Sequence, residues 1–225
     1  MTAAHPDHVH PAWLPPEAFR ALGSRHTVLC GAGTLVDTVR QEIAAACARY
    51  GGTLRHQVSG VTGGDGPGPV DLVLALTSVR ELPAPAAALR DAPGEELGAE
   101  GYALGRRDGV TVVLADEPAG LLYGLFHLVR LGSAAFGADQ PVRRHVPATG
   151  LRMLNHWDNV DVHPVMGQVE RGYSGGSIFW RDGALRTDLD RVRDYARLLA
   201  ACGINAVTVN NVNVHATEAR LLTDR

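Results

Sequence analysis

The sequence predicts an α/β protein in which strands and helices share a mixed layer, and three observations lead to this expectation. The 225 residues suffice for one large domain or two modest ones, with the 45% hydrophobic and 20% charged composition of a globular protein. An apolar segment at residues 27–30, a glycine turn and apolar positions at helical spacing over residues 35–50 indicate strand, turn and helix. A nearly continuous apolar run at residues 70–76 is typical of a strand covered on both faces.

Turn and strand signals alternate through the rest of the first half. Two glycines end the first helix, residues 53–58 form a predicted second strand, and the glycine- and proline-rich residues 59–69 form a predicted surface loop. Asp108-Gly109 lies between two apolar segments and predicts a β-hairpin. A strongly apolar predicted helix then begins at Pro118 and ends at Gly132.

The pattern changes after residues 141–150, which contain two prolines and form a predicted linker. Residues 151–154 form a short predicted strand that runs directly into five polar or amphipathic residues. A helix over residues 189–200 and a strand over residues 205–209 follow, and polar residues 210–213 end that strand as well. Strand, helix and strand in this order predict the opening βαβ unit of a parallel sheet or barrel, with polar side chains gathered at one end.

Residues 160–183 form a long predicted loop between the first strand and the helix of this unit. Four aromatic residues lie in or beside the loop: Trp157, Tyr173, Phe179 and Trp180. A disordered linker is depleted in aromatic residues, whereas a sugar-binding pocket uses flat apolar faces beside polar donors. The cluster therefore favours a pocket, with the alternative that the rings cap the end of a barrel core.

The absence of lysine excludes several kinds of chemistry. All 21 Lys and Arg residues are Arg, so a phosphate-binding P-loop lysine, a Schiff-base lysine and a Ser-Lys pair are excluded. A net charge of -3 argues against a nucleic-acid partner. We expect the apolar runs to be too short for a bilayer span, so no membrane association is expected.

The cysteines and the amino-terminus indicate a reduced, cytoplasmic protein. Cys30, Cys47 and Cys202 are far apart without metal-ligand spacing, and we expect all three to be buried. The first ten residues contain neither a basic start nor an apolar stretch, so no secretory signal is expected.

No cofactor or metal is expected. His5, His8 and His10 lie in a proline-containing tail, where histidines are usually solvated rather than metal-bound. Gly31-Ala32-Gly33 follows a strand and suggests a dinucleotide site, but the third glycine of that motif is replaced by Val36. Nucleotide binding therefore stays a weak alternative.

Several segments carry a family resemblance, and they occur in the expected order. Those in the second half are residues 154–159 (Leu-Asn-His-Trp-Asp-Asn), 170–175 (Glu-Arg-Gly-Tyr-Ser-Gly), 194–198, 203–205 and 210–213. They resemble the start of the catalytic barrel in glycoside hydrolase family 67, the α-glucuronidases. Residues 98–102 and 120–128 resemble the non-catalytic α/β domain that precedes the barrel in that family and in β-hexosaminidases.

The resemblance implies an amino-terminal α/β sandwich-like domain, similar to the second domain of hexosaminidases, followed by the first βαβ of an incomplete (β/α)8 barrel. The expected organisation is a flexible tail at 1–20, a non-catalytic α/β domain at 21–140, a linker at 141–150 and the start of the barrel at 151–225. A complete barrel needs about 250 residues. We therefore expect a truncated protein.

The activity implied by the resemblance is hydrolysis of the α-1,2 bond between 4-O-methylglucuronic acid and xylose in xylan-derived oligosaccharides. The mechanism is inverting and needs a carboxylic acid and a carboxylate base. The family keeps both on later barrel strands, so we expect no catalytic residue in this chain, and a homodimer only for the full-length protein. The alternative is a non-enzymatic carbohydrate-binding or scaffold module derived from such an enzyme.

The resemblance also implies the substrate-binding residues, which are Trp157, Glu170, Arg171, Asn210, Asn211 and Val212. Trp157 and Val212 resemble the apolar sheath around the methyl ether of the sugar. Glu170 and Arg171 lie on the loop that approaches the sugar, or else only pin that loop. The two asparagines hydrogen-bond sugar hydroxyls or merely end the strand. Residues 162–168 make the loop longer than the family pattern.

Overall fold

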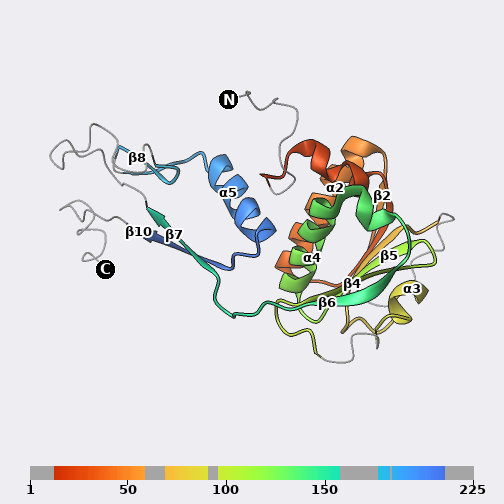
Figure 1. Ribbon diagram of the computed structural model, residues 1–225. Coiled ribbons are helices and arrows are strands. Elements are labelled where there is room, and N and C mark those ends of the chain that lie inside the picture. Colours follow the sequence, from red (N-terminus) through yellow and green to blue (C-terminus); the bar gives the residue numbers. More distant parts are fainter. Residues whose placement is uncertain (1–12, 59–68, 91–95, 158–176, 183, 211–225) are drawn as a thin grey trace, which may run out of the picture. The chain divides into compact units, whose positions relative to one another are not determined.

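The computed structural model describes residues 13–58, 69–90, 96–157, 177–182 and 184–210 of the chain (Figure 1). The chain divides into two compact units, Met1–Ala148 and Thr149–Arg225, and each is described by itself.

Unit 1 is built on a six-stranded mixed sheet with the strand order β2-β1-β3-β5-β4-β6. The first four strands in this order are parallel, and β4 is antiparallel to both of its neighbours. The strand bounds are His26–Cys30 (β1), Thr53–Gln57 (β2), Leu72–Leu76 (β3), Tyr102–Arg107 (β4), Val110–Ala115 (β5) and Gln140–His145 (β6). The predicted mixed α/β layer is thus confirmed.

Two long helices cover one face of this sheet, and they pack against each other (Figure 1). They are Thr34–Tyr50 (α2) and Pro118–Leu131 (α4). The short elements are Pro16–Phe19 (η2), Arg20–Gly23 (α1), Ala84–Ala87 (α3) and Gly132–Phe136 (η3). Of these, α3 contacts β3 and β5, whereas α1 contacts α2. All five residues of β3 are buried, as expected of a strand covered on both faces.

Helix α4 approaches the sheet closely because two of its positions are glycine. A Cβ atom at Gly120 would lie 2.1 Å from the carbonyl oxygen of Gly101, and one at Gly124 would lie 2.5 Å from Cγ1 of Val113. Neither distance is sterically possible, so the helix and the sheet need glycine at both positions to pack at this distance.

The predicted hairpin joins β4 to β5 through Asp108 and Gly109. Both residues have positive φ, 50° and 78°, as a tight two-residue turn requires. The carboxylate of Asp139 accepts hydrogen bonds from both of their backbone N–H groups, at 2.9 and 3.3 Å. The turn is thereby tied to the segment that leads into β6.

Among the described residues, one helical stretch, Pro118–Phe136, is long and apolar enough to cross a membrane. The expectation that the apolar runs are too short for a span is therefore wrong for this stretch. The stretch comprises α4 and η3, and most of its apolar side chains are buried in the core of unit 1. A core helix satisfies the same length and hydropathy criteria as a membrane span.

Three further expectations differ from the structure. Residues 141–145 belong to edge strand β6 rather than to a linker, because β4 offers them a free backbone edge. In the tail predicted for residues 1–20, Phe19 is buried and the carbonyl of Pro16 accepts a hydrogen bond from the Tyr50 hydroxyl (2.7 Å). Cys202 is exposed, whereas Cys30 and Cys47 are buried as expected.

Unit 2 contains a strand, a helix and a second strand parallel to the first. These elements are Met153–Trp157 (β7), Asp190–Ala201 (α5) and Ala206–Asn210 (β10). A small hairpin of Trp180–Arg181 (β8) and Ala184–Leu185 (β9) begins within the predicted loop of residues 160–183 and ends just after it. The βαβ prediction is confirmed, although β7 extends three residues beyond its predicted end at 154.

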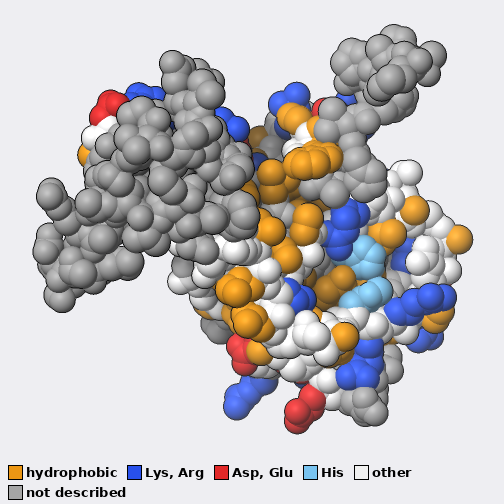
Figure 2. Space-filling model, turned by 60° about the vertical axis from the view of Figure 1, so that its left-hand side comes forward, with side chains coloured by type: hydrophobic (Ala, Val, Ile, Leu, Met, Phe, Trp, Pro, Cys, Tyr) orange, Lys and Arg blue, Asp and Glu red, His pale blue; other side chains and the backbone are white. Residues whose placement is uncertain are grey.

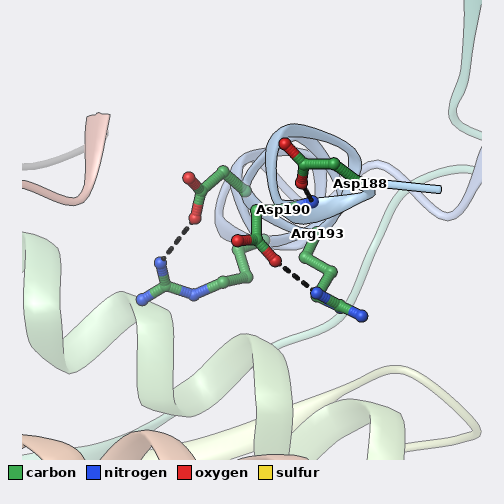
Figure 3. Close-up of polar contacts among 5 residues, drawn as sticks. Asp188, Asp190 and Arg193 are labelled. Carbon is green, nitrogen blue, oxygen red and sulfur yellow. Dashed lines mark hydrogen bonds and ion pairs between the residues drawn. The ribbon is translucent and has the colours of Figure 1, made fainter. Parts of the chain in front are cut away.

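Polar side chains at the start of α5 support its first turn (Figure 3). Oδ1 of Asp188 accepts a hydrogen bond from the backbone N–H of Asp190 (3.0 Å), which is unpaired within the helix itself. Asp190 also pairs with Arg193, one helical turn further on. Because both partners are exposed, this ion pair contributes little to stability.

Candidate functional site

The candidate site lies at the carboxyl ends of β7 and β10, where the backbone register makes polar and aromatic positions of the two strands neighbours. In the parallel register of the pair, Trp157 is opposite Asn210, and Asn155 is opposite Thr208. In parallel α/β structures the carboxyl ends of the strands form the binding edge. The register thus places two of the predicted site residues next to each other, although 53 positions separate Trp157 from Asn210.

The two faces of this strand pair have different surroundings. His156 contacts Tyr195 of α5, so the face that carries residue 156 is the one covered by the helix. Because successive strand residues alternate between faces, Asn155 belongs to the opposite face. In a (β/α)8 barrel the helices lie outside, and the face away from them is the interior.

His156 fastens the end of β7 to two other segments of unit 2. Its Nδ1 atom is hydrogen-bonded to the Tyr195 hydroxyl (3.0 Å), and its ring meets those of Tyr195 and Phe179 edge-on at centroid distances of 5.2 and 5.5 Å. Burial raises the pKa of Tyr195, so its hydroxyl stays protonated. These contacts support the strand position directly before Trp157.

Phe179 is itself held by a local turn. The Oγ atom of Ser177 accepts hydrogen bonds from the backbone N–H groups of Phe179 (2.9 Å) and Trp180 (2.7 Å). Phe179 belongs to the aromatic cluster predicted from the sequence, whereas His156 and Tyr195 were not predicted as supporting residues. Both residues lie within segments that carry the family resemblance, 154–159 and 194–198, and this position is the signal that could have indicated them.

The predicted site residues are described to different extents. Trp157 and Asn210 end β7 and β10, and their backbones are neighbours. The remaining four lie outside the described residues: Glu170, Arg171, Asn211 and Val212. The tail histidines at positions 5, 8 and 10 also lie outside them.

The first of the two glycines that suggested a nucleotide site is explained by packing. A Cβ atom at Gly31 would lie 2.9 Å from Cδ1 of Leu76, so the glycine makes room for a core side chain. The carbonyl oxygen of Gly31 is hydrogen-bonded to Nε2 of His56 (2.9 Å). Within the described ranges, no group of three or more His, Cys, Asp or Glu side chains is placed to hold a metal ion.

Comparison with known proteins matches nearly the whole chain to one family. Residues 18–128 match the glycosyl hydrolase family 67 N-terminus, and residues 137–225 match the glycosyl hydrolase family 67 middle domain. The chain belongs to glycoside hydrolase family 67. Its two units therefore correspond to the amino-terminal domain of this family and the start of its middle, barrel domain.

Named relatives of this family 67 chain are fungal proteins. Alpha-glucuronidase A of Emericella nidulans is 41% identical over 122 residues, which are 54% of this chain and 14% of that protein. The probable alpha-glucuronidase A of Aspergillus oryzae is 42% identical over 123 residues, with the same shares of 54% and 14%. That of Aspergillus clavatus is 40% identical over 132 residues, or 58% and 15%. The matched region thus spans about one seventh of each relative.

Proposed function

We propose that this chain supplies the amino-terminal domain and the first barrel strands of an α-glucuronidase, and that the rim of these strands binds the glucuronic acid unit of the substrate. The substrate class is xylan-derived oligosaccharides that carry 4-O-methylglucuronic acid linked α-1,2 to xylose. The observation that carries the proposal is the register of β7 and β10, which brings Trp157 and Asn210 together at the carboxyl ends of parallel strands.

The residue types at this rim suit an uncharged portion of such a sugar. An indole face packs against apolar sugar surface and a methyl ether, while an amide donates to and accepts from hydroxyl groups. In the proposal, Val212 adds a branched apolar surface and Asn211 a second amide. Glu170 and Arg171 approach the sugar from the loop, where the planar fork of the arginine suits a carboxylate.

Catalysis is assigned to residues beyond this strand pair. An inverting glycosidase needs two carboxyl groups about 6.5–9.5 Å apart on opposite sides of the scissile bond. We assign these groups to barrel strands that follow β10 in the fold. The chain itself then binds the sugar without cleaving it.

A binding experiment on the full chain tests the proposal. Intrinsic tryptophan fluorescence is followed while 4-O-methylglucuronic acid is added, with xylose as the neutral control sugar. We expect a saturable change with the acid alone, lost in Trp157→Ala and weakened in Asn210→Ala. Trp13→Ala is the matched control, because Trp13 is 68% exposed and lies in unit 1. A saturable signal that survives Trp157→Ala would contradict the assignment of the rim.

A hydrolysis assay separates binding from catalysis. We expect no release of 4-O-methylglucuronic acid from aldouronic oligosaccharides by this chain, and release would place the catalytic carboxylates within it. The DNA that follows the codon of Arg225 gives an independent test. Further βα units with paired carboxylates support the enzyme, whereas an immediate stop codon in a complete gene supports a non-enzymatic carbohydrate-binding module.

We also propose a cytoplasmic location. The three cysteines are free thiols, and two of them are buried as small apolar side chains, which suits a reducing compartment. Fractionation of the native host, with detection of the chain by an antibody, tests this assignment. Recovery in the extracellular fraction would overturn it.

A further inference from the structure

Three rings from three elements of unit 1 contact one another at the edge of the six-stranded sheet. Tyr102 of β4 stacks on His145 of β6, with centroids 5.0 Å apart and planes at 16°. His127 of α4 meets His145 edge-on at 4.7 Å, and its Nδ1 atom is hydrogen-bonded to the Tyr102 hydroxyl (2.9 Å). Figure 2 shows histidine side chains lying close together at the surface. We call these three residues the ring cluster, and it ties α4 to edge strand β6.

Strand β6 is attached to the sheet along one side. In the described sheet its strand neighbour is β4, and the pairing of the two strands shifts register part-way along. Val142 packs against Gly105, where a Cβ atom would lie 2.8 Å from Cγ2 of Val142, and Arg144 donates to the carbonyl of Glu96 (2.6 Å). None of the six residues of β6 is buried. A strand that buries so little of itself leaves a sheet at lower cost than a core strand does.

The two histidines of the ring cluster are neutral at pH 7. Burial, with the nearby charges of His145 and Arg130, lowers the pKa of His127 to about 4. Burial and the charge of Arg143 lower the pKa of His145 as well. When β6 leaves the sheet, the two rings move apart and regain water, so they take up protons more readily. Proton uptake therefore favours the separated strand.

Other charged or titratable side chains adjoin the rings on the elements packed around them: Glu100, Arg106, Tyr123, Arg130, Arg143 and Arg144. Glu100 accepts a hydrogen bond from Tyr123 (3.4 Å), and both residues, like Arg130 and Arg144, have further interactions. Arg106 donates to a carbonyl and to a threonine hydroxyl. Strand β5, which also packs against α4, carries no titratable side chain. None of the charges that lower the pKa of His127 lies on α2, the other helix in contact with α4.

The contact between the two imidazoles is direct, so they repel each other once both are protonated, whatever groups their neighbours bind. Tyr102 brings no compensating negative charge, because burial raises its pKa and keeps its hydroxyl protonated. The repulsion acts between α4, which belongs to the core, and β6, which does not. The edge strand is therefore the element that moves.

We propose that the ring cluster is an acid-sensitive switch, which holds β6 on the sheet at neutral pH and releases it when the two histidines are protonated, while the rest of unit 1 stays folded. The chain continues from β6 through residues 146–152 into β7, so release lengthens the connection between the two units. The switch lies within unit 1 and does not depend on sugar binding at the barrel strands.

The test is amide hydrogen exchange of the full chain at pH 7 and pH 5, followed by NMR and corrected for the intrinsic pH dependence of exchange. Strand β3 is the internal reference, because all of its residues are buried and its amides report on unfolding of the whole unit. We expect the protection of the β6 amides that pair with β4 to fall about tenfold between the two pH values. At pH 5 it should be lower than that of β3 by about tenfold or more.

Two results of this measurement would overturn the proposal. Equal protection of β6 and β3 at pH 5 would show that the strand leaves only when unit 1 unfolds as a whole. Protection of β6 that is the same at both pH values would show that the rings do not respond to acid.

The decisive variant combines His145→Phe with His127→Gln, because the phenyl ring still stacks on Tyr102 and neither replacement takes up a proton. We expect the protection of β6 in this variant to be the same at both pH values, and a persisting tenfold change would overturn the proposal. His145→Phe alone should show a smaller change than the wild type, and an unreduced change would also overturn it. The readout is the change with pH, so a loss of stability common to both pH values does not affect it.

His26→Gln is the matched control. His26 is an exposed histidine of β1 whose Nδ1 atom is hydrogen-bonded to the Thr53 hydroxyl (2.9 Å), away from the ring cluster. The variant should keep the wild-type change in β6 protection. Loss of that change in His26→Gln would overturn the assignment of the switch to His127 and His145.

Discussion

Asn205 and Arg152 are joined by two hydrogen bonds at the beginning of the β7–β10 pair. The backbone N–H of Arg152 donates to Oδ1 of Asn205 (2.9 Å), and the backbone N–H of Asn205 donates to the carbonyl of Arg152 (3.1 Å). Nδ2 of Asn205 also donates to the carbonyl of Gly150 (2.6 Å). One side chain therefore satisfies two backbone groups just before the strands begin, and it helps to set the register that places Trp157 opposite Asn210.

Replacement of Asn205 by Ala should loosen this strand pair. The substitution removes both side-chain hydrogen bonds, and each contributes about 1 kcal/mol at an exposed position. We expect faster amide hydrogen exchange at residues 153–157 and 206–210. Thr149→Ala serves as the control, since it removes only a long, exposed hydrogen bond (3.5 Å). Unchanged exchange in Asn205→Ala would show that packing alone sets the register.

Unit 1 should lose stability in mild acid because of His127. Its pKa is about 4 in the folded protein, below the value of 6.5 that it regains on unfolding. Below pH 6.5 the unfolded chain therefore binds more protons, and stability falls until about pH 4. After allowance for solvent screening, the effect amounts to about 1–2 kcal/mol.

The Tyr102 hydroxyl lies 2.9 Å from Nδ1 of His127 and is hydrogen-bonded to it. His127→Gln provides the comparison, because a side-chain amide offers the hydroxyl a hydrogen-bonding group but does not titrate. Urea unfolding followed across this pH range should show a flatter pH dependence in the variant than in the wild type. The same slope in both proteins would contradict the assignment of the acid sensitivity to His127.

The close approach of α4 to the sheet predicts that adding a methyl group at either helix glycine destabilises unit 1. Gly120→Ala should cost more than Gly124→Ala, because the methyl group meets the backbone carbonyl of Gly101 in the first case and a side-chain methyl group of Val113 in the second. Overpacking of this kind costs about 1–3 kcal/mol. Urea midpoints of the two variants test the order, which fails if Gly124→Ala is the less stable protein.

Unit 2 should exchange its amides much faster than the core of unit 1. Leu154, Val207 and Val209 are 39%, 42% and 50% exposed, although strands of a parallel barrel are normally covered on both faces. Strong protection at residues 153–157 and 206–210, comparable with that of β3, would contradict this expectation.

The exposed apolar side chains of β10, Val207 and Val209, should also promote association of the chain. An uncovered strand edge with apolar side chains is a template for pairing with another molecule. We expect Val209→Lys to raise the concentration at which light scattering detects aggregates, because a charge on an edge strand opposes such pairing. Ser24→Lys, an exposed change in unit 1, should leave that concentration unchanged.

Elements with strong local signals were predicted from the sequence. The apolar run of β3, the helical spacing in α2 and α4 and the Asp108-Gly109 turn each depend on residues that are close in the chain. The polar ends of β7 and β10 likewise indicated a site before any strand pairing was known. Local periodicity and turn chemistry carry this information because they act over only a few residues.

Tertiary structure decided the features that depend on distant partners. Strand β6 is mostly polar and contains a proline, so only the free edge of β4 makes it a strand. Three elements must pack together before Tyr102, His127 and His145 form one cluster, and the depressed pKa values exist only in that packed state. By itself the sequence determined the long helices, the apolar strands and the family to which they belong. Long-range pairing and burial decided which side chains meet, because those interactions join residues that are far apart along the chain.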